Sequence, residues 1–206
     1  IIGKGFVGSA VNFGFSSQEN CEIKIYDKNP KKSQDSLSKV VNDSDFIFIS
    51  VPTPANTDGS INLEVVDKCL NEINHVIKSD AILLLRSTMI PGSSNMFQQK
   101  YPKLNIVFNP EFLTERNADF DFINQSRFIL GGNVNHVKKV SKLYRWRFGS
   151  LIPIIETTFE TAELIKYMNN CFLATKVSFL NEMKLIAYQC GADWENSVKG
   201  FSLDRR

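Results

Sequence analysis

The first residues suited to binding chemistry are three glycines, spaced as G-x-G-x-x-G in Gly3-Lys4-Gly5-Phe6-Val7-Gly8. They follow the apolar pair Ile1-Ile2 and precede an apolar run, an order that predicts strand, glycine turn and helix. Glycine turns without a Cβ penalty, and the N-terminus of the following helix attracts an anion such as a phosphate. The spacing alone is a weak indication, because an ordinary tight turn can have the same sequence.

Asp27 strengthens the interpretation of this loop as a dinucleotide site. It ends a short apolar segment, residues 22–26, that we predict as a second strand, and it lies nineteen residues after Gly8. A carboxylate at about that spacing hydrogen-bonds the ribose hydroxyls of a bound dinucleotide. We therefore favour a dinucleotide-binding loop over a simple turn.

A second chemical candidate lies on a long helix predicted from Glu160 to Cys190. The stretch 157–160 has the T-x-x-E form of a capping box, and no Gly or Pro follows before Gly191. Such a helix would be about 45 Å long, more than one face of a small sheet can cover. It carries Lys166 and Asn170 one turn apart on the same side. Composition favours a solvated surface lysine at position 166, but the neighbouring Asn169-Asn170 pair is an unusual choice for a helix interior.

The elements that must position these groups alternate along the chain. Strands are predicted at 45–51, 81–85, 105–108, 127–130 and 152–155, and helices at 33–42, 63–77 and 136–148. This alternation predicts an α/β fold with right-handed crossovers and a doubly wound parallel sheet. We place the first domain at residues 1–156, and the long helix and the start of an incomplete second domain at 157–206.

Ligands bind such sheets beyond the carboxyl ends of the strands. Five segments should therefore open onto one edge: the glycine loop, Asp27, Pro52-Thr53-Pro54, Ser87-Thr88 and 109–115. The hydroxyls near Ser87 and Thr88 are also available to cap the next helix. Thr53 and Thr88, taken singly, are equally compatible with a turn or a cap.

Composition favours a small-molecule partner. The chain has 206 residues, 43% of them hydrophobic, enough for one good core and part of a second. Its net charge of +2 gives no electrostatic case for nucleic acid or a membrane surface. Four cysteines without C-x-x-C spacing predict buried reduced thiols, no metal site and a cytoplasmic setting: Cys21, Cys69, Cys171 and Cys190. The histidines, His75 and His136, fall on predicted surface helices and should be exposed.

Together these segments resemble the UDP-glucose/GDP-mannose dehydrogenase family. The resemblance covers nearly the whole chain, and its most specific parts are N-P-E-F-L-x-E at 109–115 and A-E-L-I-K-Y-x-x-N at 162–170. It implies a Rossmann-like domain that uses NAD. The implied reaction is oxidation of a nucleotide sugar, UDP-glucose to UDP-glucuronate, in two hydride transfers through a thioester.

The resemblance also implies roles for individual residues. The cofactor site would comprise Gly3, Gly5, Phe6, Val7, Gly8, Asp27, Lys32, Thr53, Thr88 and Glu115. The nucleotide sugar would meet Glu111, Phe112, Leu113, Glu115, Lys166, Asn170 and, from a dimer partner, Arg206. The catalytic groups would be Glu111 as proton donor or acceptor, Lys166 on the developing alkoxide, Asn170 on the oxyanion, and Thr88.

Two departures from the family pattern affect these expectations. The segment between Asp27 and Asp45 is shorter than in the family, which predicts a trimmed sheet. The family's nucleophilic cysteine lies in an F-G-x-G-x-C segment that this sequence lacks, and Cys171 and Cys190 have no glycine loop or neighbouring base to replace it. Since the chain also starts at Ile1, we interpret it as a piece of a longer protein, inactive alone.

Three functions therefore stay open. The favoured one is the N-terminal part of a nucleotide-sugar dehydrogenase with a homodimer built on the long helix. The second is a single-step hydroxyacid-type dehydrogenase of the 6-phosphogluconate or 3-hydroxyisobutyrate group, against which the N-P-E-F-L-x-E segment argues. The third is a non-catalytic nucleotide-binding or dimerisation module. NAD is expected over NADP because Asp27 would repel a 2′-phosphate, although Lys28, Lys31 and Lys32 argue the other way.

Overall fold

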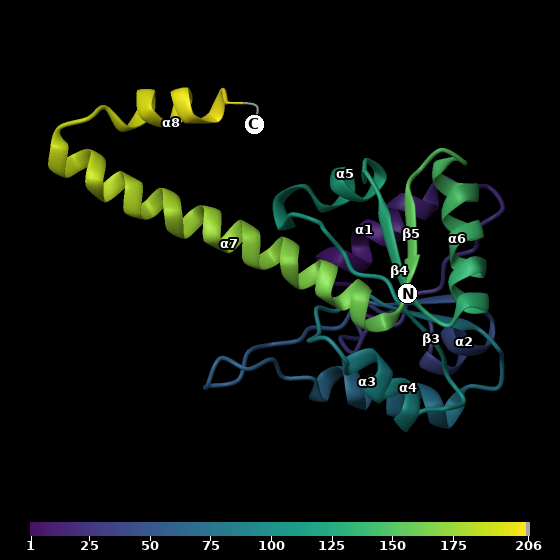
Figure 1. The fold of residues 1–206 in the computed structure, drawn as a ribbon. Helices are drawn as coiled ribbons and strands as arrows, with labels where there is room; N and C mark the ends of the chain where they lie inside the picture. The colour runs from purple at the N-terminus through teal and green to yellow at the C-terminus, as the bar shows by residue number, and fades with distance from the viewer. Residues whose placement is uncertain (205–206) are drawn as a thin grey trace. The chain divides into compact units, whose positions relative to one another are not determined.

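The computed structural model describes residues 1–204 and forms two compact units, one up to Lys166 and one from Tyr167 onward. The first unit holds a sheet flanked by helices, and the second holds most of one long helix and a short one (Figure 1). The domain boundary predicted at residue 157 stays a prediction; it falls at the end of a strand, just before the long helix that starts at Phe159.

The sheet has five strands in the order β1-β2-β3-β4-β5. The strands are β1 (Phe46–Ile49), β2 (Ile82–Leu85), β3 (Asn105–Phe108), β4 (Phe128–Gly132) and β5 (Ile154–Thr157). Beyond β1, Ile2 forms parallel bridges to both Ile49 and Tyr26, so the start of the chain extends the same sheet. The predicted Rossmann-like α/β class is confirmed.

One pairing corrects the prediction of a uniformly parallel sheet. β4 runs antiparallel to β3, with Phe108 opposite Gly131, whereas β4 and β5 are parallel. The segment between β3 and β4 contains only a 3₁₀ turn (Glu115–Asn117) and α5 (Ala118–Ile123). A helix of six residues spans about 9 Å, too little to carry the chain back across the sheet. The next strand therefore starts at the edge where β3 ends.

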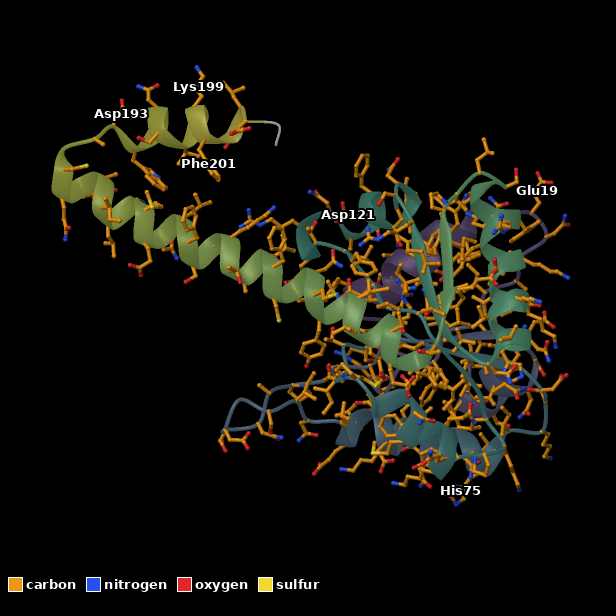
Figure 2. The ribbon with its side chains drawn as sticks, viewed as in Figure 1. Glu19, His75, Asp121, Asp193, Lys199 and Phe201 are labelled. Atoms are coloured by element: carbon orange, nitrogen blue, oxygen red, sulfur yellow. The ribbon has the colours of Figure 1, made fainter. Side chains whose placement is uncertain are left out.

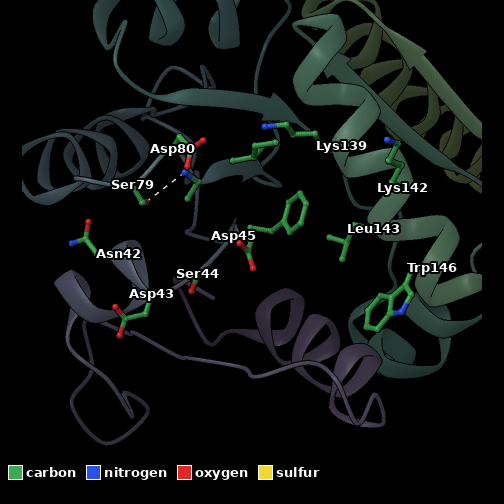
Figure 3. A pocket seen from close by; sticks show the side chains of 13 residues that line it. Asn42, Asp43, Ser44, Asp45, Ser79, Asp80, Lys139, Lys142, Leu143 and Trp146 are labelled. Carbon is green, nitrogen blue, oxygen red and sulfur yellow. Dashed lines mark hydrogen bonds between the residues drawn. The ribbon is translucent and has the colours of Figure 1, made fainter.

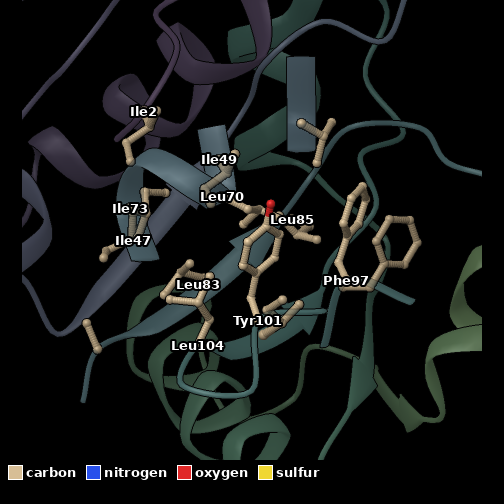
Figure 4. Packing of buried hydrophobic residues seen from close by; sticks show 14 of the residues in the cluster. Ile2, Ile47, Ile49, Leu70, Ile73, Leu83, Leu85, Phe97, Tyr101 and Leu104 are labelled. Carbon is tan, nitrogen blue, oxygen red and sulfur yellow. The ribbon is translucent and has the colours of Figure 1, made fainter. Parts of the chain in front are cut away.

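The helices cover both faces of the sheet (Figure 1). In the first unit these are α1 (Phe6–Ser16), α2 (Leu37–Asn42), α3 (Glu64–Val76), α4 (Ser93–Lys100) and α6 (Val134–Phe148), besides α5, while α7 (Phe159–Cys190) starts in the first unit and α8 (Trp194–Ser202) belongs to the second. Alternate strand residues enter two cores: Ile47 and Ile49 pack with α2, α3 and α4, and Phe48 packs with α1, α5 and α6. Figure 4 shows the first core, where Leu70 and Phe97 lie among strand side chains. Each such buried side chain contributes roughly 1.5–3 kcal/mol.

The sheet is trimmed as predicted between Tyr26 and β1. Within the described residues this segment contains α2 and no strand of its own. Instead, the main-chain O of Ile25 accepts hydrogen bonds from the N–H groups of Gln34 and Asp35, and Asp35 Oδ2 accepts from Ile25 N. The turn thus occupies the hydrogen-bonding edge that a further strand would use.

The long predicted helix is present as α7, with 32 residues. Thr158 Oγ1 accepts a hydrogen bond from Thr161 N at its start, and Gly191, with φ +71°, follows its end. In the second unit α8 packs on α7 through Phe179 and Phe201, whose ring centroids lie 6.4 Å apart. Figure 2 shows Phe201 turned toward α7 and Lys199 turned away from it.

Candidate functional site

Glycine is suited to each of the three positions in the first loop for a different structural reason. Gly3 has φ +89°, which only glycine adopts readily, and it makes the turn. A Cβ on Gly8 would lie 1.9 Å from the Gly3 main-chain O, so Gly8 allows α1 to pack closely on the first strand. A Cβ on Gly5 would meet nothing within 4 Å. Gly5 thus leaves an open surface where a pyrophosphate can approach the backbone.

Asp27 lies beside this loop, as the spacing predicts. Its Oδ2 accepts a hydrogen bond from Lys4 N at 2.6 Å, and its Oδ1 accepts one from Asn29 N at 2.8 Å. The carboxylate is half-buried and is oriented by these two backbone amides. The arrangement fits a dinucleotide, because the remaining lone pairs of the carboxylate can accept from ribose hydroxyls.

The other predicted cofactor residues follow the carboxyl ends of β1 and β2. Thr53 and Thr88 are both half-buried, while Lys32 is exposed in the turn after Asp27. Ser87 Oγ donates to the main-chain O of Val51 at 2.5 Å, so the two strand ends are tied together. The parallel register of β1 and β2 places these residues on one edge of the sheet, as expected.

The centre of the candidate site is a buried ion pair between Lys166 and Glu111. Lys166 Nζ lies 2.8 Å from Glu111 Oε1 and also donates to the Glu111 main-chain O, and the two side chains are only 5% and 13% exposed. The ammonium also lies 5.3 Å from the Phe112 ring centroid. Glu111 Oε2 accepts from Leu113 N at 2.7 Å. The alternative of a solvated Lys166 is therefore wrong, since tertiary packing buries it.

Not every predicted site residue is buried as this pair is. Glu115 is exposed in the 3₁₀ turn, and Asn170 is exposed in the second unit. Arg206 lies outside the described residues. The roles predicted for these three residues stay predictions.

A buried polar cluster that was not predicted from the sequence lies behind the Asn109-Pro110-Glu111 turn. Arg86 is 1% exposed, and its NH1 donates to Asn109 Oδ1 at 2.7 Å. Tyr144 OH donates to the same oxygen at 2.5 Å, and burial raises the pKa of Tyr144 to about 12. Asn109 Nδ2 in turn donates to the main-chain O of Ile129 at 3.0 Å. An arginine that ends an apolar strand was the one available indication of this cluster.

The hydroxyls near Ser87 and Thr88, expected either to cap α4 or to meet a ligand, do not cap this helix. Its N-cap residue is Gly92, which makes no side-chain cap hydrogen bond. The acceptor is the carboxylate of Glu163 from α7, at 2.6 Å from Gly92 N and 2.7 Å from Ser94 N. A contact across about seventy residues leaves no local pattern.

The cysteines are free thiols, but the prediction that all are buried is wrong. Cys171 and Cys190 are exposed on α7, and Cys21 and Cys69 are half-buried. Burial raises the pKa of the Cys69 thiol to about 12. α7 has apolar residues around its circumference, so the apolar neighbourhood of Cys171 and Cys190 in the sequence does not make a core.

Neither histidine forms part of a metal site among residues 1–204, where no group of His, Cys, Asp and Glu could hold an ion. His75, labelled in Figure 2, is exposed on α3, and its Nδ1 lies 2.8 Å from the Asn71 main-chain O. His136 is half-buried rather than exposed, and burial lowers its pKa.

A cavity of about 630 Å³ lies away from the candidate site (Figure 3). Phe46 and Ile82, the first residues of β1 and β2, line it, together with Lys139, Lys142 and Trp146 of α6. It is therefore at the amino edge of the sheet, opposite the glycine loop. None of the predicted site residues lines it.

The chain matches known proteins along most of its length. Residues 31–147 match the family model described as UDP-glucose/GDP-mannose dehydrogenase family, NAD binding domain, and residues 160–206 match the central domain of the same family. A UDP-glucose 6-dehydrogenase of Rickettsia bellii (strain RML369-C) is 36% identical over 165 residues, which cover 78% of this chain and 38% of the relative. YwqF, a UDP-glucose 6-dehydrogenase of Bacillus subtilis (strain 168), is 33% identical, with 83% and 40% covered.

Solved structures of dehydrogenases have the same fold as this chain. A UDP-glucose dehydrogenase from the archaeon Pyrobaculum islandicum superposes with a TM-score of 0.88 and 26% identity, covering 100% of this chain and 56% of that one. A GDP-mannose dehydrogenase from Pseudomonas aeruginosa, solved as a ternary complex, gives 0.85 and 26%, with 100% and 56% covered. A 3-hydroxyisobutyrate dehydrogenase of Mycobacterium tuberculosis, at 16% identity and a TM-score of 0.73, shares the fold.

These matches cover most of this chain but only part of each relative. The chain spans about two fifths of the length of the curated relatives it matches. No helix within residues 1–204 is long and apolar enough to cross a membrane. The family model names an NAD binding domain, so the prediction of NAD as the cofactor is confirmed. The chain belongs to the UDP-glucose/GDP-mannose dehydrogenase family, and its sheet unit contains that family's NAD binding domain.

Proposed function

We propose that this chain provides the NAD site and part of the sugar site of a dehydrogenase that oxidises UDP-glucose to UDP-glucuronate in two hydride transfers through a thioester. The observation that carries the proposal is the buried ion pair between Lys166 and Glu111. It joins the two most specific segments of the chain, 55 residues apart, at the carboxyl edge of the sheet. The similarity to UDP-glucose 6-dehydrogenases supports UDP-glucose as the substrate.

The chemistry assigns a role to each partner of the pair. Oxidation of an alcohol removes a hydride and a proton, and bound NAD supplies the hydride acceptor. The Lys166 ammonium would stabilise the developing alkoxide, an interaction that is strongest where water is excluded. Glu111 would donate or accept the proton, and would orient water when the thioester is hydrolysed. Asn170 would add an amide donor to the oxyanion, and Thr88 would lie beside the reacting carbon and the cofactor.

The cofactor side of the proposal is tested by comparing the dissociation constants of NAD and NADP in calorimetric titrations. Asp27 should repel a 2′-phosphate, and the two backbone amides leave its carboxylate little freedom to move away. We expect NAD to bind more tightly, and Asp27→Asn to narrow the difference. Tighter binding of NADP to the unchanged chain would reject the role of Asp27 and assign the neighbouring lysines to the phosphate.

The substrate side is tested with UDP-glucose and NAD together. We expect this 206-residue chain to bind NAD without releasing NADH, because it lacks the F-G-x-G-x-C segment that would carry the nucleophilic cysteine. Release of two NADH for each sugar from this chain alone would contradict the proposal.

The proposal includes assembly and location. The second unit exposes large apolar side chains along α7, among them Met168, Phe172, Val177 and Tyr188. Exposed apolar surface of this extent usually marks an interface, and we propose that it pairs with a second copy of the chain. The free thiols and the proposed cofactor are consistent with a cytoplasmic setting.

A further inference from the structure

Glu163 is a buried carboxylate that the proposed chemistry does not use. It is 0% exposed, and its two oxygens accept hydrogen bonds from Gly92 N and Ser94 N at 2.6 and 2.7 Å. Desolvation raises the pKa of Glu163, and the bonds from Ser94 and Gly92 act in the opposite direction. A carboxylate of α7 thus accepts hydrogen bonds from two amides at the start of α4.

The geometry makes this contact more than a helix cap. Gly92 closes the loop that starts at Ser87 and Thr88 after β2, so one end of the contact lies on a predicted cofactor segment. The other end lies three residues before Lys166, which is one turn further along α7. Ala162, next to Glu163, is also fully buried, and an added Cβ on Gly131 would lie 2.7 Å from its Cβ. The start of α7 is thus packed closely against β4.

Two charge-assisted contacts fix the start of α7 in the first unit. Glu163 binds the N-terminus of α4, and Lys166 binds Glu111. Both are stronger than neutral hydrogen bonds, and an anion at a helix N-terminus gains further from the helix dipole. Because a helix transmits a displacement along its axis, release of the first contact would move the ammonium at the second.

We propose that Glu163 is a positioning residue, which holds Lys166 against Glu111 and ties the Thr88 loop to the same helix. The functional part of this inference rests on the proposed function, but the geometric part does not. A misplacement of about 1 Å is enough to cost a hundredfold in rate at a well-aligned site. Glu163 would thus set the distance on which the chemistry of Lys166 depends, without touching the sugar or NAD itself.

The test is the rate at which the Lys166 amine is acylated by a brief pulse of acetic anhydride, followed by peptide mass spectrometry. Glu163→Gln keeps the shape of the side chain but points an NH₂ group at one of the two amides. Glu160→Gln is the matched control, since Glu160 is exposed one turn earlier on the same helix. Exposed Lys176 on α7 is the internal rate reference, and Lys24, 8% exposed and distant in sequence, reports unfolding of the sheet unit.

In the unchanged chain and in Glu160→Gln, Lys166 should be labelled much more slowly than Lys176. In Glu163→Gln we expect Lys166 labelling to rise roughly tenfold, equivalent to ~1.4 kcal/mol, with Lys24 unchanged. Unchanged Lys166 labelling would overturn the proposal. A parallel rise at Lys24 means general destabilisation, and a second variant then decides.

A second variant covers the case in which Glu163→Gln does not fold. Glu163→Asp keeps the charge but is one methylene shorter, and should raise Lys166 labelling to an intermediate level. Labelling equal to that of the unchanged chain would again overturn the proposal. NAD titration of the same samples distinguishes the positioning role of Glu163 from the proposed function. If the chain fails to bind NAD but Lys166 labelling still rises selectively in the variant, the proposed function is rejected and the positioning role is retained.

Discussion

Substitution of alanine at two glycines of the first loop should have opposite effects on stability and on NAD binding. Gly5 has φ −79° and ψ −165°, a conformation that alanine can adopt, and its added methyl group would extend into open space. Gly8 is buried, and its added methyl group would lie 1.9 Å from the Gly3 main-chain O and 3.3 Å from Ile1 Cγ2. The first change alters only the surface that meets the cofactor, while the second displaces α1 from its strand.

The magnitudes follow from these environments. Gly5→Ala reduces the conformational freedom of the unfolded chain, which stabilises the fold, and replaces glycine with a poorer N-cap residue, which destabilises it. Because these two effects nearly cancel, the free energy of unfolding should change by less than about 0.5 kcal/mol. The dissociation constant for NAD should rise by roughly tenfold or more, because the pyrophosphate can no longer approach the backbone. For Gly8→Ala the free energy of unfolding should fall by about 1–3 kcal/mol or more, since backbone atoms must move.

Urea unfolding gives the first quantity and calorimetric titration with NAD gives the second. Gly200→Ala is a suitable control: its methyl group would also meet nothing within 4 Å, but it lies on α8 in the second unit. It should leave NAD binding unchanged. If Gly5→Ala bound NAD as tightly as the unchanged chain, the loop would not cradle the pyrophosphate. If Gly8→Ala unfolded at the unchanged urea concentration, the close packing of α1 would not be the reason for this glycine.

Lys166→Ala, placed in a longer protein with measurable turnover, should lower turnover by about 100- to 1,000-fold, which corresponds to a loss of ~3 to 4 kcal/mol of transition-state stabilisation, and should change NAD affinity little. Lys176→Ala, at an exposed position of the same helix, is the control. Near-normal turnover of Lys166→Ala would remove Lys166 from the mechanism. Burial raises the pKa of Tyr144 from 10.0 to about 12, so its stabilising contribution is complete below pH 10 and is lost as the pH rises toward 12. Urea unfolding should show a loss of roughly 3 kcal/mol over that range, and Tyr144→Phe should flatten the dependence. A thiol reagent near neutral pH should modify exposed Cys171 well before Cys69, whose pKa burial raises to about 12; equal rates would contradict the packing of Cys69. Sedimentation at micromolar concentration should show a dimer that Phe172→Glu weakens, and a clean monomer of the unchanged chain would count against pairing through α7.

Local patterns in the sequence were sufficient to predict most elements of the fold. β3 was predicted at its observed residues, and α3 and α7 to within one residue at each end, because apolar periodicity and capping residues act over a few positions. The positions of the glycine loop and Asp27 were likewise predictable, but the strand predicted at 22–26 was wrong: only Tyr26 pairs, in a single bridge with Ile2. The family could be inferred because two segments, at 109–115 and 162–170, carry uncommon residue combinations.

Tertiary structure decided what depends on distances between remote segments. The direction of β4 depends on the position at which the short α5 ends, and no pattern within a strand encodes that position. Lys166 reads as a surface lysine in its helix, and it is buried only because the Glu111 segment folds against it. The contacts of Glu163 with Gly92 and of Arg86 with Asn109 join residues 71 and 23 positions apart. Desolvation makes such buried polar groups need partners, and only the folded chain determines which partners are within reach.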